Sequence, residues 1–231
     1  AYFAASDTYI EKDASINEEI DKYRHQATQS LLTRRDVIIV ASVSCIYGLG
    51  SVEDYEGLAM TIKKGETVQR DQLLRRLTDI QFRRSHLELK QGMFHVLGDT
   101  VEIFPSSEDF IYKLDFWGDE IESIQEADAF TGEILKEHDQ VVIFPTKHNV
   151  TTDEKIKKAV KGIEQELEQQ IKYFQDQGKL VEAQRIKTRT EFDLEMLLET
   201  GYTSGIENYV RYFGEREAGS QPPTLLDYFP E

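Results

Sequence analysis

The stretch that decides the fold class is Asp36–Gly50, with the sequence DVIIVASVSCIYGLG. It begins as a continuous apolar run, changes to small polar residues and ends in two glycines. Such a run predicts a strand buried on both faces of a parallel sheet, with a tight loop at its carboxyl edge. Ligand sites of α/β proteins lie along that edge, so Ser42 and Ser44 are expected either to contact a phosphate or to cap the strand.

The hydrophobic content and the cysteine and histidine residues indicate which classes of protein this chain can belong to. The chain has 231 residues, of which 39% are hydrophobic, enough to build real cores. Its single cysteine, Cys45, allows neither an internal disulfide nor a thiolate zinc site, so a reducing cytoplasm is expected. The five histidines show no metal-ligand spacing, and no stretch reaches the roughly 20 apolar residues that a membrane span needs. We therefore expect a cytoplasmic chain with neither a metal site nor a membrane partner.

The charge is strongly acidic. The 27 basic and 43 acidic residues give a net charge of −16, the wrong sign for holding DNA by generic phosphate attraction. Any contact with DNA must therefore be local.

Residues 1–150 read as a helix, a sheet strand and then a β-rich insertion. Ser15 and Glu18 form a capping box that opens a helix to about Thr33, and 52–60 reads as a short helix. Strand patterns separated by glycine-containing turns follow at 93–97, 100–104, 111–117 and 141–144. This pattern predicts a small antiparallel module inserted into a larger fold.

The last third of the chain is helical. A capping box at 151–154 precedes apolar residues at helical spacing from Ile156 to Phe174, and Gly178 ends that helix. A second amphipathic run, Leu180–Leu198, most simply folds back as an antiparallel helical hairpin rather than extending into a dimeric coiled coil. The glycine- and aromatic-rich residues 201–219 are expected to form a loop that returns to the sheet.

Three segments carry a family resemblance: Asp7–Asp13 (DTYIEKD), the stretch at 36–50 and Ser204–Tyr209 (SGIENY). Together they closely resemble UvrB, the B-subunit family of the bacterial nucleotide-excision-repair excinuclease, and the resemblance runs from end to end. It implies part of a helicase-like (RecA-like, P-loop NTPase type) α/β parallel-sheet lobe, with an inserted antiparallel β-rich module and a helical hairpin. In this reading 1–57 belongs to helicase-like domain 1a, 58–150 is the UvrA-binding domain 2 and 151–231 is the helical domain 1b.

Nucleotide chemistry is expected to lie outside this chain. No G-x-x-x-x-G-K-[ST] phosphate loop occurs in it, nor does a strand ending in Mg²⁺-binding carboxylates. The resemblance places the phosphate loop upstream of Ala1 and the acidic helicase motif beyond Glu231. We expect no cofactor and no catalysis in the chain itself, and ATP with Mg²⁺ in the longer protein, a DNA-dependent ATPase within the excinuclease complex.

The resemblance implies a DNA contact near the amino terminus. Ala1–Asp13 is similar to the second strand of an aromatic-rich DNA-clamping β-hairpin, with Tyr2 and Tyr9 at positions that meet DNA. Aromatic faces stack on bases without sequence preference, although two tyrosines taken alone would more simply be surface or core residues. Arg24 matches a basic position beside the DNA path, and Lys12 and Glu207 match residues that close the hairpin against the motor core. The first hairpin strand is expected to be missing, which would leave Tyr9 without a cross-strand partner.

The β-rich module is similar to the domain that docks the A subunit, UvrA. Arg84 matches one of the arginines of the docking face, and Asp115 matches an acidic position there. His95 and Leu97 depart from the pattern, since relatives usually carry arginine at both. Arg83 and Arg75-Arg76 are candidates to compensate. A polar face of a half-exposed sheet is the alternative interpretation of all these residues.

The resemblance implies a fragment of a damage-verification subunit that docks UvrA, clamps damaged DNA and works with the nuclease UvrC. One alternative is the equivalent region of the transcription-repair coupling factor, which docks UvrA but lacks the strand at 7–13. The other is a pure UvrA-binding adaptor whose DNA elements are inert.

Overall fold

The computed structural model describes residues 2–3, 8–9, 18–46, 49–214, 216–217 and 219–230. At the amino terminus, β1 (Tyr2–Phe3) and β2 (Thr8–Tyr9) pair antiparallel, with Tyr2 opposite Tyr9. The expectation that Tyr9 lacks a cross-strand partner is therefore wrong. Lys12 lies outside the described residues.

The strand predicted at 36–46 is also wrong. After α1 (Glu18–Thr33) the chain is irregular to residue 42 and then forms the 3-10 helix η1 (Val43–Ile46). Ile38 and Val40 are 93% and 96% exposed. A strand needs a neighbour to satisfy its backbone groups, and the described residues place none beside this stretch: their only parallel pair, β4–β5, belongs to the module.

The β-rich module begins after α2 (Val52–Gly57), whose amino end is capped by the Ser51 side chain accepting from Asp54 N. A six-stranded sheet runs in chain order, and apart from its first, parallel pair it is antiparallel. Its strands are β4 (Arg83–Arg84), β5 (Met93–Leu97), β6 (Thr100–Phe104), β7 (Phe110–Trp117), β8 (Glu120–Asp128) and β9 (Ile134–Glu137). A separate antiparallel pair joins β3 (Met60–Lys63) to β10 (Gln140–Ile143).

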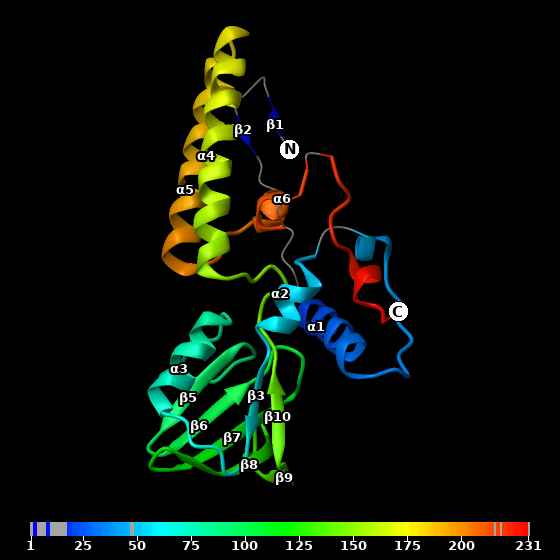
Figure 1. Ribbon diagram of the computed structural model, residues 1–231, viewed down its shortest axis with the longest axis vertical. Coiled ribbons are helices and arrows are strands. Elements are labelled where there is room, and N and C mark those ends of the chain that lie inside the picture. Colours follow the sequence, from blue (N-terminus) through cyan, green and yellow to red (C-terminus); the bar gives the residue numbers. More distant parts are fainter. Residues whose placement is uncertain are drawn as a thin grey trace.

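The module's core lies on one face of the six-stranded sheet. Helix α3 (Arg70–Asp79) and the β3–β10 pair cover that face (Figure 1). Fully buried residues from all three layers form one cluster that includes Leu77, Ile62, Ile143 and Leu114. Because side chains alternate along a strand, the intervening residues of β5–β8 form the opposite face.

The helical hairpin is confirmed. Helices α4 (Asp153–Asp176) and α5 (Leu180–Thr200) pack together and extend away from the module (Figure 1). Gly178, with φ of +71°, makes the turn between them. The returning segment contains η2 (Ile206–Tyr209) and α6 (Val210–Phe213), which packs on α4.

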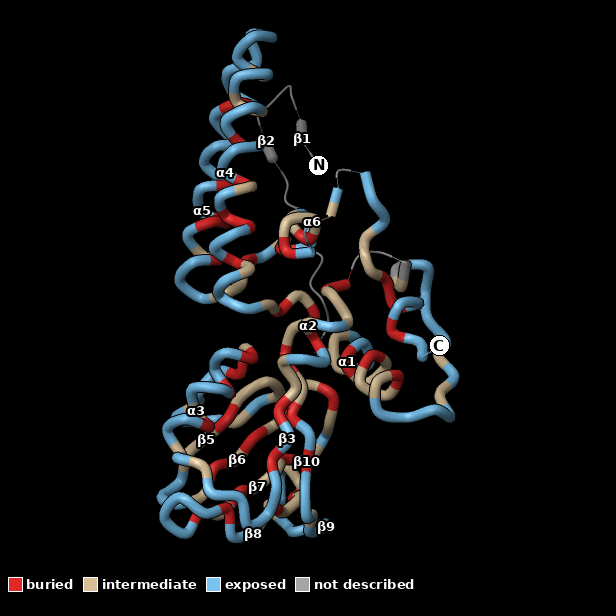
Figure 2. The backbone as a smooth tube through the Cα atoms, viewed as in Figure 1, coloured by how far each residue is buried: buried red, intermediate tan, exposed pale blue. Residues whose placement is uncertain are grey.

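A third core joins segments far apart in the sequence. Leu31 of α1, Tyr55 of α2 and Tyr228 of η3 (Leu225–Tyr228) belong to one buried cluster. Figure 2 shows red, buried stretches in both α1 and the C-terminal segment. None of the described helices is long and apolar enough to cross a membrane.

Candidate interaction surfaces

The open face of the module is the sheet surface away from its core. The strand register sets two cross-strand rows on this face. The first is His95–Glu102–Lys113–Gln125 and the second is Leu97–Thr100–Asp115–Ser123. Lys113 Nζ lies 3.3 Å from Glu102 Oε1, so the centre of the first row is a neutralised ion pair. The fold thus brings three of the predicted residues, His95, Leu97 and Asp115, onto one surface.

Asp115 is held in a fixed orientation. Thr100 Oγ1 donates to its Oδ1 and Ser123 Oγ to its Oδ2, each over 2.7 Å. Hydroxyl groups on both neighbouring strands therefore preorganise this carboxylate without neutralising its charge.

Arg84 lies at the edge of the sheet. In β4 the exposed pair Arg83 and Arg84 stand opposite Met93 and Phe94 of β5. Successive side chains alternate between faces, so the register places Arg83 on the side of His95 and Arg84 on the other side. Arg84 adjoins the open face without belonging to its rows.

A cleft of about 1810 Å³ separates the module from α1 and from the facing ends of α4 and α5. Its described lining carries seven acidic and four basic side chains, an unfavourable balance for phosphate. Lys147 and Tyr202 form part of its wall, with Nζ 5.6 Å from the ring centroid.

Arg24 and Glu207, predicted from opposite ends of the chain, both influence the hydroxyl of Tyr202 electrostatically. Burial raises the pKa of the Tyr202 hydroxyl, the charges of Glu207 and Asp21 raise it further, and Arg24 opposes them. Arg24 Nη1 also lies 3.6 Å from Asp21 Oδ1. The predicted roles of these two residues stay predictions, and Lys12 is outside the described residues.

The segment that carries Glu207 is anchored by a residue that sequence reasoning missed. Asp193 of α5 is buried and accepts from Arg189 Nε at 3.1 Å, Thr203 Oγ1 at 3.2 Å and Tyr209 OH at 2.8 Å. Burial, with Asp193 alongside, raises the pKa of Tyr209 to about 12. A carboxylate in an amphipathic helix gives no signal of this role, because its partners come from a later loop.

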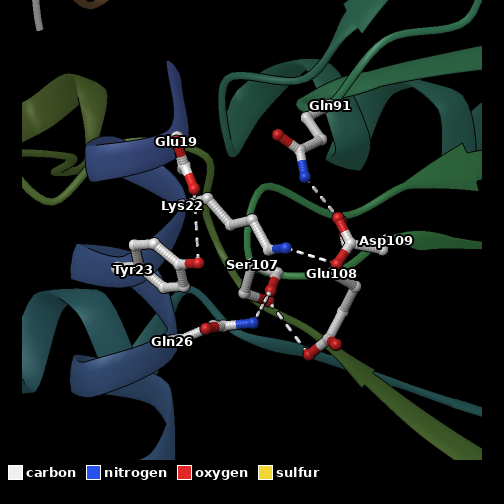
Figure 3. Close-up of polar contacts among 8 residues, drawn as sticks. All are labelled: Glu19, Lys22, Tyr23, Gln26, Gln91, Ser107, Glu108 and Asp109. Carbon is white, nitrogen blue, oxygen red and sulfur yellow. Dashed lines mark hydrogen bonds and ion pairs between the residues drawn. The ribbon is translucent and has the colours of Figure 1, made fainter. Parts of the chain in front are cut away.

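Polar contacts fix α1 against the module (Figure 3). Lys22 pairs with Asp109, and Gln26 Nε2 donates to the Ser107 carbonyl over 2.7 Å. Ser107 Oγ donates to Gln29 Oε1 over 2.7 Å. Burial raises the pKa of the neighbouring Glu108 carboxyl. The β6–β7 connection is therefore held by one side of α1.

Beneath these contacts lies a buried stack of rings. His25 and His148 stack with centroids 4.1 Å apart, and Tyr55 lies 5.4 Å from His148. His25 Nδ1 is 3.1 Å from Tyr55 OH, and His148 Nε2 is 3.1 Å from Thr28 Oγ1. Burial lowers the pKa of His25 to about 4 and that of His148 well below its usual value. These histidines are packing residues, as expected, and the described residues contain no cluster that could hold a metal ion.

Comparison with known proteins decides the family. The UvrB interaction domain matches residues 60–149, and the UvrB third helical domain matches 154–215. Proteins named UvrABC system protein B from Bacillus licheniformis and Geobacillus kaustophilus are each 56% identical, and that of Bacillus subtilis is 55% identical, over 232 aligned residues. The chain belongs to the UvrB family. The matches cover 100% of this chain and 35% of each of these UvrB relatives.

The family assignment fits the geometry. The UvrB interaction domain coincides with the β-rich module, so the open face is a surface of that domain. The UvrB third helical domain begins in the first turn of α4 and ends beyond α6, and thus includes the Asp193 anchor. Identity to UvrB relatives along the whole chain favours this family over the transcription-repair coupling factor.

Proposed function

We propose that the chain is the part of a nucleotide-excision-repair damage-verification subunit that docks UvrA through its module and helps to hold damaged DNA near β1–β2. One observation carries this proposal. The UvrB interaction domain folds as a sheet with one face packed into its core and the other left open, and the open face bears His95, Leu97 and Asp115. Arg84 lies on the edge strand β4 beside this sheet, on the side opposite to His95, and its neighbour Arg83 lies on the side of the open face.

The docking contact should be sensitive to charge at Arg84. Replacing Arg84 by glutamate puts a negative charge against an acidic partner, so we expect a loss of about 1–3 kcal/mol in binding free energy if the contact is partly desolvated. Pull-down and calorimetric titration with purified UvrA measure this loss. Lys136→Glu on β9, the opposite edge strand, is the matched control and should bind normally. Unchanged affinity for Arg84→Glu would remove this residue from the interface.

The DNA contact is proposed for the hairpin strands. In the antiparallel pair of β1 and β2, Tyr2 stands opposite Tyr9. Glu207 lies on a segment that Asp193 anchors to α5. This anchoring would hold Glu207 in position to pair with Lys12. Stacking of about 1–3 kcal/mol per base would compensate for the acidic field of the chain.

Tyr9→Ala should separate DNA handling from protein docking. In the full-length UvrB protein we expect impaired loading on lesion DNA, because one stacking platform is lost, with UvrA binding unchanged. A gel-shift loading assay run beside a UvrA pull-down reads both effects. Wild-type loading by Tyr9→Ala would contradict the proposal. The adaptor alternative would instead be supported by two results together. The chain binds UvrA, and loading of the full-length protein on lesion DNA does not depend on Tyr9.

ATP and Mg²⁺ are proposed to act in the longer protein, with UvrC as a further partner in the pathway. The described residues do not fit a phosphate cradle. A methyl group added at Gly50 would lie 2.0 Å from the His148 carbonyl oxygen. The space beside this glycine is therefore filled by the protein's own backbone. We therefore propose that nucleotide chemistry belongs to the longer protein.

A further inference from the structure

The open face ends in the only tryptophan of the chain. Trp117 is the last residue of β7 and is 78% exposed, and Leu97 at the end of β5 is 51% exposed. Large apolar side chains exposed together at the end of a folded sheet are unfavourable in water and mark contact surfaces. Neither residue contributes to the module's core.

Register places Trp117 close to the fixed carboxylate of Asp115, with Leu97 farther along the same row beyond Thr100. Leu97 and Asp115 belong to the same cross-strand row, and Trp117 is two residues beyond Asp115 on the same strand. The register shift after Asp115 falls on β8, so the side chains of β7 keep alternating and Trp117 faces the same side as Asp115. Phe116 N donates to the Asp99 carbonyl over 2.9 Å. This bond joins the end of β7 to the turn between β5 and β6.

The three side chains suit a guanidinium group. Each oxygen of Asp115 accepts one hydrogen bond within the sheet, and a carboxylate offers about four acceptor sites, so the outward sites can still take a bidentate donor. An indole face is the best aromatic partner for a cation. Leu97, beyond Thr100 in the same row, adds exposed apolar surface for the partner to cover.

We propose that Leu97, Asp115 and Trp117 form a docking surface for an arginine of the partner protein, with Trp117 as the principal contact. This inference rests on the docking role proposed for the module. At this end of the face the partner therefore supplies the cation.

The surrounding charges favour a cationic protein over nucleic acid. Asp119 and Glu120 adjoin Trp117 in the exposed turn, and their charges repel phosphate. Arg83, on the same side of the sheet as His95, lies beside the opposite end of β5. Opposite charges at the two ends of one face orient a protein partner, because only one alignment matches both.

The test measures binding of the chain to purified UvrA by calorimetry. Trp117→Ala should weaken binding at least tenfold, as is typical of a buried aromatic anchor. Asp115→Asn should weaken it several-fold, Trp117→Phe should retain most of it, and Trp117→Arg should abolish it by placing a like charge against the arginine. Phe130→Ala, which removes a 96% exposed aromatic from another turn of the module, is the matched control and should bind normally.

The salt series identifies the chemistry of the contact. The tenfold effect of Trp117→Ala should persist at high salt because much of it is apolar, whereas the effect of Arg84→Glu should shrink. Full affinity for both Trp117→Ala and Trp117→Arg, in a chain that binds UvrA, would overturn this inference and leave the docking role standing. Absence of binding by the unmodified chain would overturn the docking role itself. Loss of self-association in Trp117→Ala with unchanged UvrA affinity would assign the surface to a second copy of the chain and also overturn the inference.

Discussion

Replacing Gly50 by alanine should destabilise the fold by about 3 kcal/mol or more. The added methyl carbon would lie 2.0 Å from the His148 carbonyl oxygen, 2.9 Å from the His148 carbonyl carbon and 3.0 Å from Asn149 Cα. All three are backbone atoms, so no side-chain rotation can relieve the clash. Overpacking a rigid core costs 1–3 kcal/mol and sometimes more. Urea denaturation followed by circular dichroism measures the change.

Gly57→Ala is the matched control for this experiment. Gly57 is the last residue of α2, and a methyl group added there meets nothing within 4 Å. Alanine loses less backbone entropy on folding than glycine, so this variant should be neutral or more stable by up to about 1 kcal/mol. A wild-type denaturation midpoint for Gly50→Ala would show that the junction between residue 50 and the segment after β10 can open.

The second large effect is a loss of stability in mild acid. Burial lowers the pKa of His25 from 6.5 to about 4, with Lys147 and Arg24 adding to this effect, and Asp21 and the Thr146 backbone opposing it. Burial also lowers the pKa of His148, and the neighbouring His25 contributes. Below pH 6.5 the unfolded chain binds protons that the folded chain does not. Stability is therefore fully present above pH 6.5 and is lost as the pH falls toward 4.

The expected magnitude for His25 alone is about 3 kcal/mol across that window, since one pKa unit corresponds to about 1.4 kcal/mol. Free energies of unfolding measured at a series of pH values between 7 and 4 test this. His25→Phe keeps a ring in the stack and removes the titrating group, so its stability should depend less on pH. His138→Asn, which alters a half-buried histidine of the module paired with Glu126, is the control. A His25→Phe curve parallel to that of the unmodified chain would contradict the assignment.

Much of the module could be read from the sequence because its strands alternate. The bounds of β5 and β6 are as predicted, β7 begins one residue earlier than predicted, and β10 is shifted by one residue at both ends. β8 was missed for a physical reason. Its buried residues Ile121, Ile124 and Ala127 are three apart, because the register shift opposite β7 interrupts the period of two between Ile121 and Ile124, and Ala127, opposite Ile111, lies on the other face of the sheet from Ile124. That spacing resembles one face of a helix.

The described part of the apolar run that begins at Asp36 contains no strand, which shows what a local hydrophobic pattern cannot predict. An apolar run predicts burial only if other segments come to cover it, and periodicity contains no information about those segments. Ile38 and Val40 have the composition of a buried strand and lie exposed among the described residues. The resemblance, by contrast, proposes roles for Arg24 and Glu207, which local reasoning alone would assign to solvated surface. His25, His148 and Trp117 could not be singled out, since each acts through neighbours that the register supplies.

The antiparallel pairing of β3 with β10 sets how the module is joined to the rest of the chain. Met60 stands opposite Ile143, so the polypeptide enters and leaves the module at neighbouring points. The distance between them is that of adjacent strands, about 5 Å. A few residues could bridge it, and closing so short a gap costs little entropy. The module can thus be inserted or replaced as a unit without changing the path of the chain on either side. Its open face can likewise change without affecting these two connections.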